Sequence, residues 1–141
     1  MPTKYEVTKQ TKAPISKAMD YYFHPENLPK IHPNFVKEVK IMSTEGDTIT
    51  LEQHMEIMGR KLRAVNKMVR SNAENKFEIS TLEGDGKGSK ITIALKEIPT
   101  GTEMHYSAAM EFGALGFFIK GPAKSSFEKV ATEDAQALDM M

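Results

Sequence analysis

The chain of 141 residues is long enough to bury a sizeable core, and we take residues 1–141 as a single domain. Its 19 basic and 19 acidic residues cancel, which argues against a nucleic-acid partner or an anionic membrane surface. The absence of cysteine excludes disulfides, thiolate metal sites and a cysteine nucleophile. No signal-like N-terminus and no bilayer-spanning apolar run occur, so we expect a cytoplasmic protein without an integral membrane segment.

The N-terminal part of the chain alternates between strand and helix patterns. Residues 5–11 alternate apolar and polar side chains, which predicts a strand with one buried face. Residues 15–23 carry apolar side chains at helical spacing, and residues 25–32 add a helical turn or two. His32-Pro33 ends that helical corner, and residues 35–42 return to a strand pattern.

The next two strands are predicted to form a hairpin with Gly59-Arg60 as its two-residue loop. In this register Met58 pairs with Lys61, one face carries opposite charges, and the other face is apolar. The apolar face also places Gln53 opposite Asn66, and buried amides need hydrogen-bond partners. The two amides either bond each other or a buried water, or they line a cavity.

Three further strands are predicted, one beginning with Phe77 and Ile79, one at Ile91–Leu95 and one at Met104–Phe112, joined by turns that contain glycine or proline. A long amphipathic helix then ends the chain, because apolar residues recur every three or four positions. We expect its regular part to start at Gly121-Pro122, with residues 115–120 as a looser entry. About 17 such residues span roughly 25 Å, which suits a helix lying along a sheet.

This order of elements resembles the helix-grip fold of the START and Bet v 1 (SRPBCC) superfamily, especially its polyketide cyclase and dehydrase-like branch. Three local motifs carry the resemblance: residues 13–23, the proline-flanked corner at residues 24–33, and Ala114-Leu115-Gly116. The resemblance implies an α+β fold in which a curved seven-stranded antiparallel sheet has two short helices between its first and second strands. It also implies a long C-terminal helix over a hydrophobic cavity that holds a hydrophobic small molecule.

We expect pliable methionine and aromatic side chains to line that cavity, although a packed core would use the same types. His32 is considered as a general base at the cavity mouth, with a surface or capping role as the alternative. Tyr106 is considered as an acid or oxyanion donor, and its hydroxyl is expected to matter little for folding. No catalytic residue is assigned, and no metal or cofactor is predicted. The predicted ligand-binding residues are Gln53, Met55, Asn66, Met68, Phe77, Met104, Tyr106, Met110, Phe118, Phe127 and His32.

Three functions are open at this point. The first is binding of a lipid-, isoprenoid- or polyketide-like molecule for transport or sequestration. The second is a polyketide cyclase or dehydratase-like enzyme, which requires an ionisable side chain that reaches the bound molecule. The third is a non-catalytic interaction module of the co-chaperone or ribosome-associated type, which would have a filled core and a large exposed apolar patch. A monomer or weak dimer is expected because the exposed sheet face carries many charges.

Overall fold

The computed structural model of the protein describes the backbone of residues 2–111 and 116–141 and the side chains of residues 2–111 and 122–141. Within these residues, seven strands form one sheet in the order β1-β7-β6-β5-β4-β3-β2. All paired neighbours are antiparallel, so β2 to β7 form a meander and β1 joins it beside β7. The strands are β1 (Thr3–Thr11), β2 (Val36–Glu45), β3 (Thr48–Ile57), β4 (Arg60–Ser71), β5 (Lys76–Gly84), β6 (Lys90–Ile98) and β7 (Gly101–Met110).

Prolines set the limits of the short helices that connect β1 to β2. Pro14 has an extended backbone and precedes α1, and Pro25 begins η1 after His24. These elements are α1 (Ile15–Tyr22), the 3₁₀ turn η1 (Pro25–Asn27) and α2 (Leu28–Ile31), and the chain ends with α3 (Gly116–Asp139). None of the described helices is both long and apolar enough to cross a bilayer.

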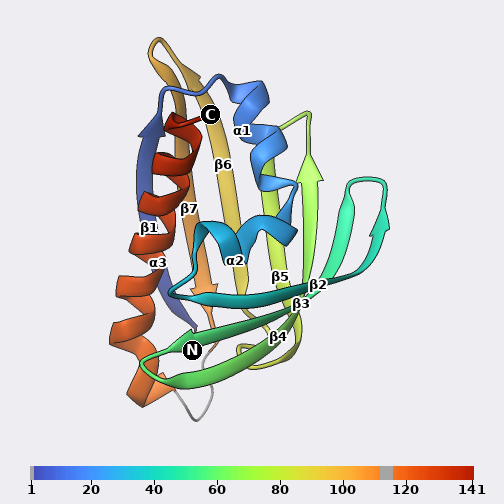
Figure 1. Cartoon of the computed structure of the whole chain (residues 1–141), viewed down its shortest axis with the longest axis vertical. Helices are drawn as coiled ribbons and strands as arrows, with labels where there is room; N and C mark the ends of the chain where they lie inside the picture. The colour runs from blue at the N-terminus through green and yellow to red at the C-terminus, as the bar shows by residue number, and fades with distance from the viewer. Residues whose placement is uncertain (1, 112–115) are drawn as a thin grey trace.

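The sheet curves around α3. In Figure 1, β6 and β7 run along the long axis of the molecule, whereas β2 to β4 turn across its front. The helix α3 packs along β1 at one edge of the sheet and also contacts β3 near the other edge. The space inside the curve is closed further by α1, which contacts β6 and β7, and by α2, which contacts β2 and α3.

The main core lies inside this curve, between the sheet and the helices. Phe77 and Met104 are fully buried at its centre, and Ala131 and Leu138 bring α3 onto it. A smaller apolar cluster of Ile57, Leu62 and Ala123 joins the β3–β4 hairpin to α3. The predicted fold class and order of elements are therefore confirmed.

The predicted register of the β3–β4 hairpin is wrong by two residues. The loop is Met58-Gly59, and Ile57 pairs with Arg60 where we expected Met58 to pair with Lys61. Both loop residues have positive φ, at 50° and 77°, as a type I′ turn requires. A shift of two residues leaves every side chain on its expected face, so the face pattern could not reveal the error.

The predicted start of the C-terminal helix is also wrong. The helix begins at Gly116 and spans 24 residues, so Pro122 lies inside it. A proline within a helix removes one backbone hydrogen bond, a loss that packing on both sides of the proline can offset. The sequence motif Ala114-Leu115-Gly116 lies partly outside the described residues, because residues 112–115 are not among them.

Gly101 is predicted to be a position that only glycine can occupy. Its φ is +145°, and an added Cβ would collide with the carbonyl oxygen of Thr11 and the backbone of Lys12 on β1 and its continuation. We expect Gly101→Ala to lower the free energy of unfolding by about 3 kcal/mol or more, because the backbones of β1 and β7 would have to separate. Urea denaturation measures this change.

Gly46 provides the matched control. Its φ is +58°, but an added Cβ would meet nothing within 4 Å. Gly46→Ala should therefore cost only the left-handed backbone strain, about 1 kcal/mol. Equal losses for the two substitutions would contradict the close approach of Gly101 to β1.

Candidate ligand-binding cavity

A cavity of about 220 Å³ lies between the concave face of the sheet and the helices. Its walls come from all seven strands, α1, the η1–α2 corner and α3. The volume falls below the roughly 300 to 1,000 Å³ of most ligand pockets, so a small molecule fits the cavity as it stands. Met55, Met68 and Met110 lie in the wall, and such unbranched side chains can move to admit a larger molecule.

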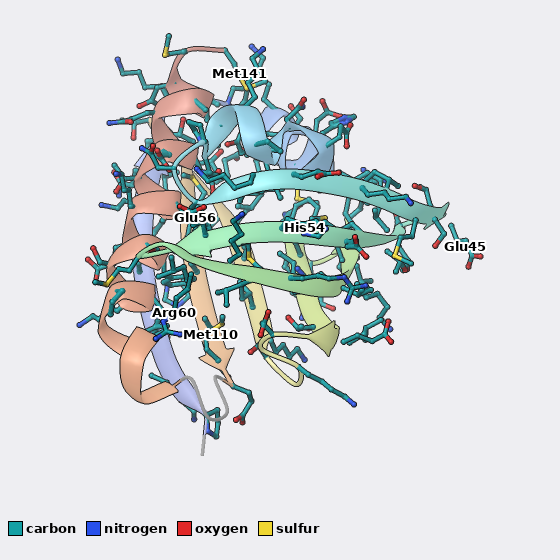
Figure 2. The ribbon with its side chains drawn as sticks, turned by 60° about the horizontal axis from the view of Figure 1, so that its bottom comes forward. Glu45, His54, Glu56, Arg60, Met110 and Met141 are labelled. Atoms are coloured by element: carbon teal, nitrogen blue, oxygen red, sulfur yellow. The ribbon has the colours of Figure 1, made fainter. Side chains whose placement is uncertain are left out.

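The structure brings most of the predicted site residues to this cavity. Met104 is not among the lining residues, because it is fully buried in the core beside the cavity. The side chain of Phe118 lies outside those that the structure describes. Figure 2 shows Met110 at the end of β7. The predicted residues in the lining are Gln53, Met55, Asn66, Met68, Phe77, Tyr106, Met110, Phe127 and His32.

The carboxylate of Asp134 on α3 is the centre of a buried polar cluster at the cavity wall. Its Oδ1 accepts hydrogen bonds from the hydroxyl of Tyr21 at 2.6 Å and from Nε2 of His32 at 2.9 Å. Its Oδ2 accepts the hydroxyl of Tyr106 at 2.7 Å, and Tyr106 is in turn hydrogen-bonded to the hydroxyl of Tyr22. We call these five residues the Asp134 cluster. It joins α1, the residue after α2, β7 and α3.

His32 is fully buried and faces a carboxylate with each ring nitrogen. Nδ1 lies 3.0 Å from Oε1 of Glu133, and Nε2 lies 2.9 Å from Asp134. A carboxylate oxygen accepts hydrogen bonds, so this geometry favours the imidazole in which both ring nitrogens carry a proton and donate. Burial alone would lower the pKa of His32, but the hydrogen bonds and charges of Asp134 and Glu133 outweigh it and raise the pKa above 6.5.

The tyrosine hydroxyls of the cluster keep their protons. Burial raises the pKa of Tyr106 well above 10.0, and the negative charge of Asp134 raises it further. The same two causes raise the pKa of Tyr22 and of Tyr21. The three hydroxyls therefore act as hydrogen-bond donors at any ordinary pH.

A second polar group faces the cavity from the sheet. Asn66 on β4 donates from Nδ2 to Oε1 of Gln53 on β3 at 3.3 Å, and Thr81 on β5 donates to Oδ1 of Asn66 at 2.8 Å. All three residues line the cavity. The sequence left two alternatives for these amides, a mutual hydrogen bond or a place in a cavity wall. The structure shows both. The two amides are diagonal neighbours and not directly opposed, because Asn66 pairs with Leu51.

Asp134 was not among the residues predicted from the sequence, although a signal was present. Asp134 lies three residues after Ala131 and four before Leu138, so it falls within the buried stripe of α3. An acidic residue inside an apolar stripe indicates a buried carboxylate that needs partners. The surface role considered for His32 is wrong, because its side chain is fully buried. The expectation that the Tyr106 hydroxyl matters little for folding overlooked its bond to Asp134.

Comparison with known families gives one match that covers nearly the whole chain. The family model described as "Polyketide cyclase / dehydrase and lipid transport" matches residues 2–139. No curated protein has a sequence similar enough to match this chain.

Solved structures share the fold at low sequence identity. A START superfamily protein from Mycobacterium smegmatis has a TM-score of 0.83 and 17% identity, with 97% of each chain covered. The Zhui aromatase/cyclase from Streptomyces sp. R1128 has a TM-score of 0.81 and 12% identity, covering 98% of this chain and 92% of that one. Ginseng major latex-like protein 151 from Panax ginseng has a TM-score of 0.76 and 12% identity, covering 95% of this chain and 96% of that one.

The protonated state of His32 predicts how stability depends on pH. Its pKa is raised by folding, so its contribution to stability is complete below pH 6.5 and is lost as the pH rises through the higher folded-state value. We expect the free energy of unfolding to fall over that window, by at most about 1.4 kcal/mol per pH unit. Urea denaturation at a series of pH values on both sides of 6.5 measures the fall.

Two variants assign this pH dependence. His32→Gln should be less stable than the wild type at low pH. Its free energy of unfolding should change much less as the pH rises. His24 also has a raised pKa, mainly from its hydrogen bond to Glu26, but it is exposed to solvent, which screens the interaction. The free energy of unfolding of His24→Gln should therefore decrease with pH nearly as much as that of the wild type. A wild-type pH profile in His32→Gln would show that His32 is not the protonated group.

Proposed function

The chain belongs to the family described as polyketide cyclase/dehydrase and lipid transport, and from that premise we propose that it binds a small, mostly apolar molecule in the cavity between the sheet and α3. The cavity carries the proposal: it is bounded by apolar side chains such as Ile79, Ile91 and Phe127, with a few polar groups in fixed positions. This combination is typical of sites that bind small molecules through an apolar body and orient them by a few hydrogen bonds.

Gln53 and Asn66 are the polar contacts that we propose on the sheet side. Each amide uses part of its hydrogen-bonding capacity within the Gln53–Asn66–Thr81 group. Among the hydrogen bonds of the described residues, the Gln53 amide nitrogen donates to no acceptor, so its two N–H bonds are available to a ligand. Met55, Met68, Phe77, Met110 and Phe127 supply the apolar contact in this proposal. Transport or sequestration of the bound molecule fits such a site, since neither needs a reactive group.

One observation favours the enzyme as a second candidate. Tyr106, Asp134 and His32 line the cavity, and an acid–base reaction needs such ionisable groups next to the bound molecule. Against this, the proton of Tyr106 and both N–H bonds of His32 are directed at the carboxylates of Asp134 and Glu133. A proton held in this way is not directed at a substrate, so binding is the better supported function.

The interaction module is supported less well than either. Among the described residues, the large exposed apolar side chains are spread over β2, the β3–β4 turn, β5 and the C-terminus: Ile41, Met42, Met58, Leu82, Met140 and Met141. A contiguous apolar patch would be expected on a docking surface. A cytoplasmic location and a monomer or weak dimer stay predictions.

Filling the cavity should abolish binding without unfolding the protein. Ala64 is buried on β4 and lines the cavity, so the larger side chain of Ala64→Phe would occupy the proposed ligand space. N-phenyl-1-naphthylamine is a neutral apolar dye, and we expect its fluorescence to increase when it binds the wild-type protein. The apparent affinity of the dye for Ala64→Phe should be at least about tenfold weaker. Fluorescence titration measures both.

Ala137→Leu is the matched control, because Ala137 lies on α3 and is not among the lining residues. It should bind the dye as the wild type does. Circular dichroism should show the same fold in all three proteins. Equal dye affinity in folded Ala64→Phe, or no binding by the wild type of this dye or of any apolar compound tested, would refute the proposed function.

A further inference from the structure

We propose that the ligand of this cavity carries a neutral hydroxyl group, which donates a hydrogen bond to the oxygens of Tyr22 and Tyr106, and that the cavity discriminates against carboxylates. The inference rests on the proposed binding function and adds the chemical class of the ligand. Its basis is the direction of the hydrogen bonds in the Asp134 cluster.

The donors of the cluster form a chain that ends at Asp134. A carboxylate accepts only, so the hydroxyl of Tyr106 gives its hydrogen to Oδ2 of Asp134. The oxygen of Tyr106 therefore accepts in its bond with Tyr22, and the hydroxyl of Tyr22 gives its hydrogen to Tyr106. Both hydrogens are used within the protein.

The two tyrosine oxygens retain acceptor capacity. A phenolic oxygen can accept as well as donate, and among the bonds of the described residues only the oxygen of Tyr106 receives a hydrogen, from Tyr22. Both tyrosines line the cavity. A ligand group that meets them must therefore bring its own hydrogen, as an alcohol or a phenol does and as an ether or a ketone does not.

A carboxylate ligand would lack a free buried cation in this cavity, and the Gln53 amide is the neutral donor left for it. Among the described side chains, no lysine or arginine lines it, and its acidic members are Asp85 and Asp134. The two N–H bonds of His32, the one buried cation in the wall, already point to Glu133 and Asp134. Removing a carboxylate from water without a paired cation is strongly unfavourable, and one neutral amide donor does not offset that cost.

An ammonium group is expected to bind at this cluster less well than a hydroxyl group. Asp134 already accepts three hydrogen bonds, and the charge of His32 lies beside it. The tyrosine oxygens that remain at the cluster are neutral acceptors, which cannot offset the loss of an ammonium's hydration. Asp85 is exposed and already accepts a hydrogen bond from the backbone N–H of Arg63, so water screens its charge. The neutral hydroxyl is the donor that these acceptors match.

The test uses the intact protein and four naphthalenes that share one apolar body: naphthol, its methyl ether, naphthoate and naphthylmethylamine. Each competes with the N-phenyl-1-naphthylamine dye at neutral pH. We expect naphthol to bind about tenfold more tightly than the ether, as one buried hydrogen bond would give, and naphthoate to bind more weakly than the ether. An ether, naphthoate or amine that binds as tightly as naphthol would overturn the inference.

A double variant assigns the preference to the two tyrosines. Tyr22→Phe together with Tyr106→Phe should reduce the preference for naphthol over the ether to less than about threefold. Thr8→Val, on the exposed hydrogen bond to His105, should keep the full preference. Should the double variant fail to fold, the wild-type series alone still decides the matter. Dye binding without a hydroxyl preference refutes this inference only, whereas loss of all binding refutes the proposed function as well.

Discussion

The buried carboxylate of Asp134 is the constraint on which the rest of the structure depends. Its negative charge lies in the buried interior of the protein, on the face of α3 that packs against the sheet. An unpaired charge there would be strongly destabilising. Tyr21 from α1, His32 from the end of the helical corner and Tyr106 from β7 each donate to it. These hydrogen bonds fix the positions of α1, the helical corner and β7 relative to α3. Apolar contacts alone would be less directional.

The cavity follows from this arrangement together with the small size of the residues beside it. Ala123 on α3 and Ala64 on β4 are small residues in its wall, whereas Ala131 and Ala135 pack in the core. Such side chains cannot reach across a curved sheet, and Phe127 is the large one that faces the space. Since the polar cluster and the sheet curvature hold the walls apart, the space stays open to a ligand.

Sequence patterns predicted the layout of the fold because each strand and helix has its own period. Alternation in Met104 to Met110 and helical spacing in α3 both identified the buried faces correctly. The hairpin register could not be predicted, since Met58 takes a positive φ that its residue type does not favour. Asp134 was missed because an acidic residue is normally assigned to the solvent face, and only its partners from α1, His32 and β7 explain its burial.

We propose that the cavity holds an apolar molecule whose hydroxyl group is recognised by the Asp134 cluster. Native mass spectrometry of the purified protein, followed by solvent extraction and identification of whatever is released, tests this proposal. We expect one neutral, mostly apolar molecule with a free hydroxyl group bound per chain. An unliganded mass that does not change when apolar alcohols and phenols are added would contradict the account.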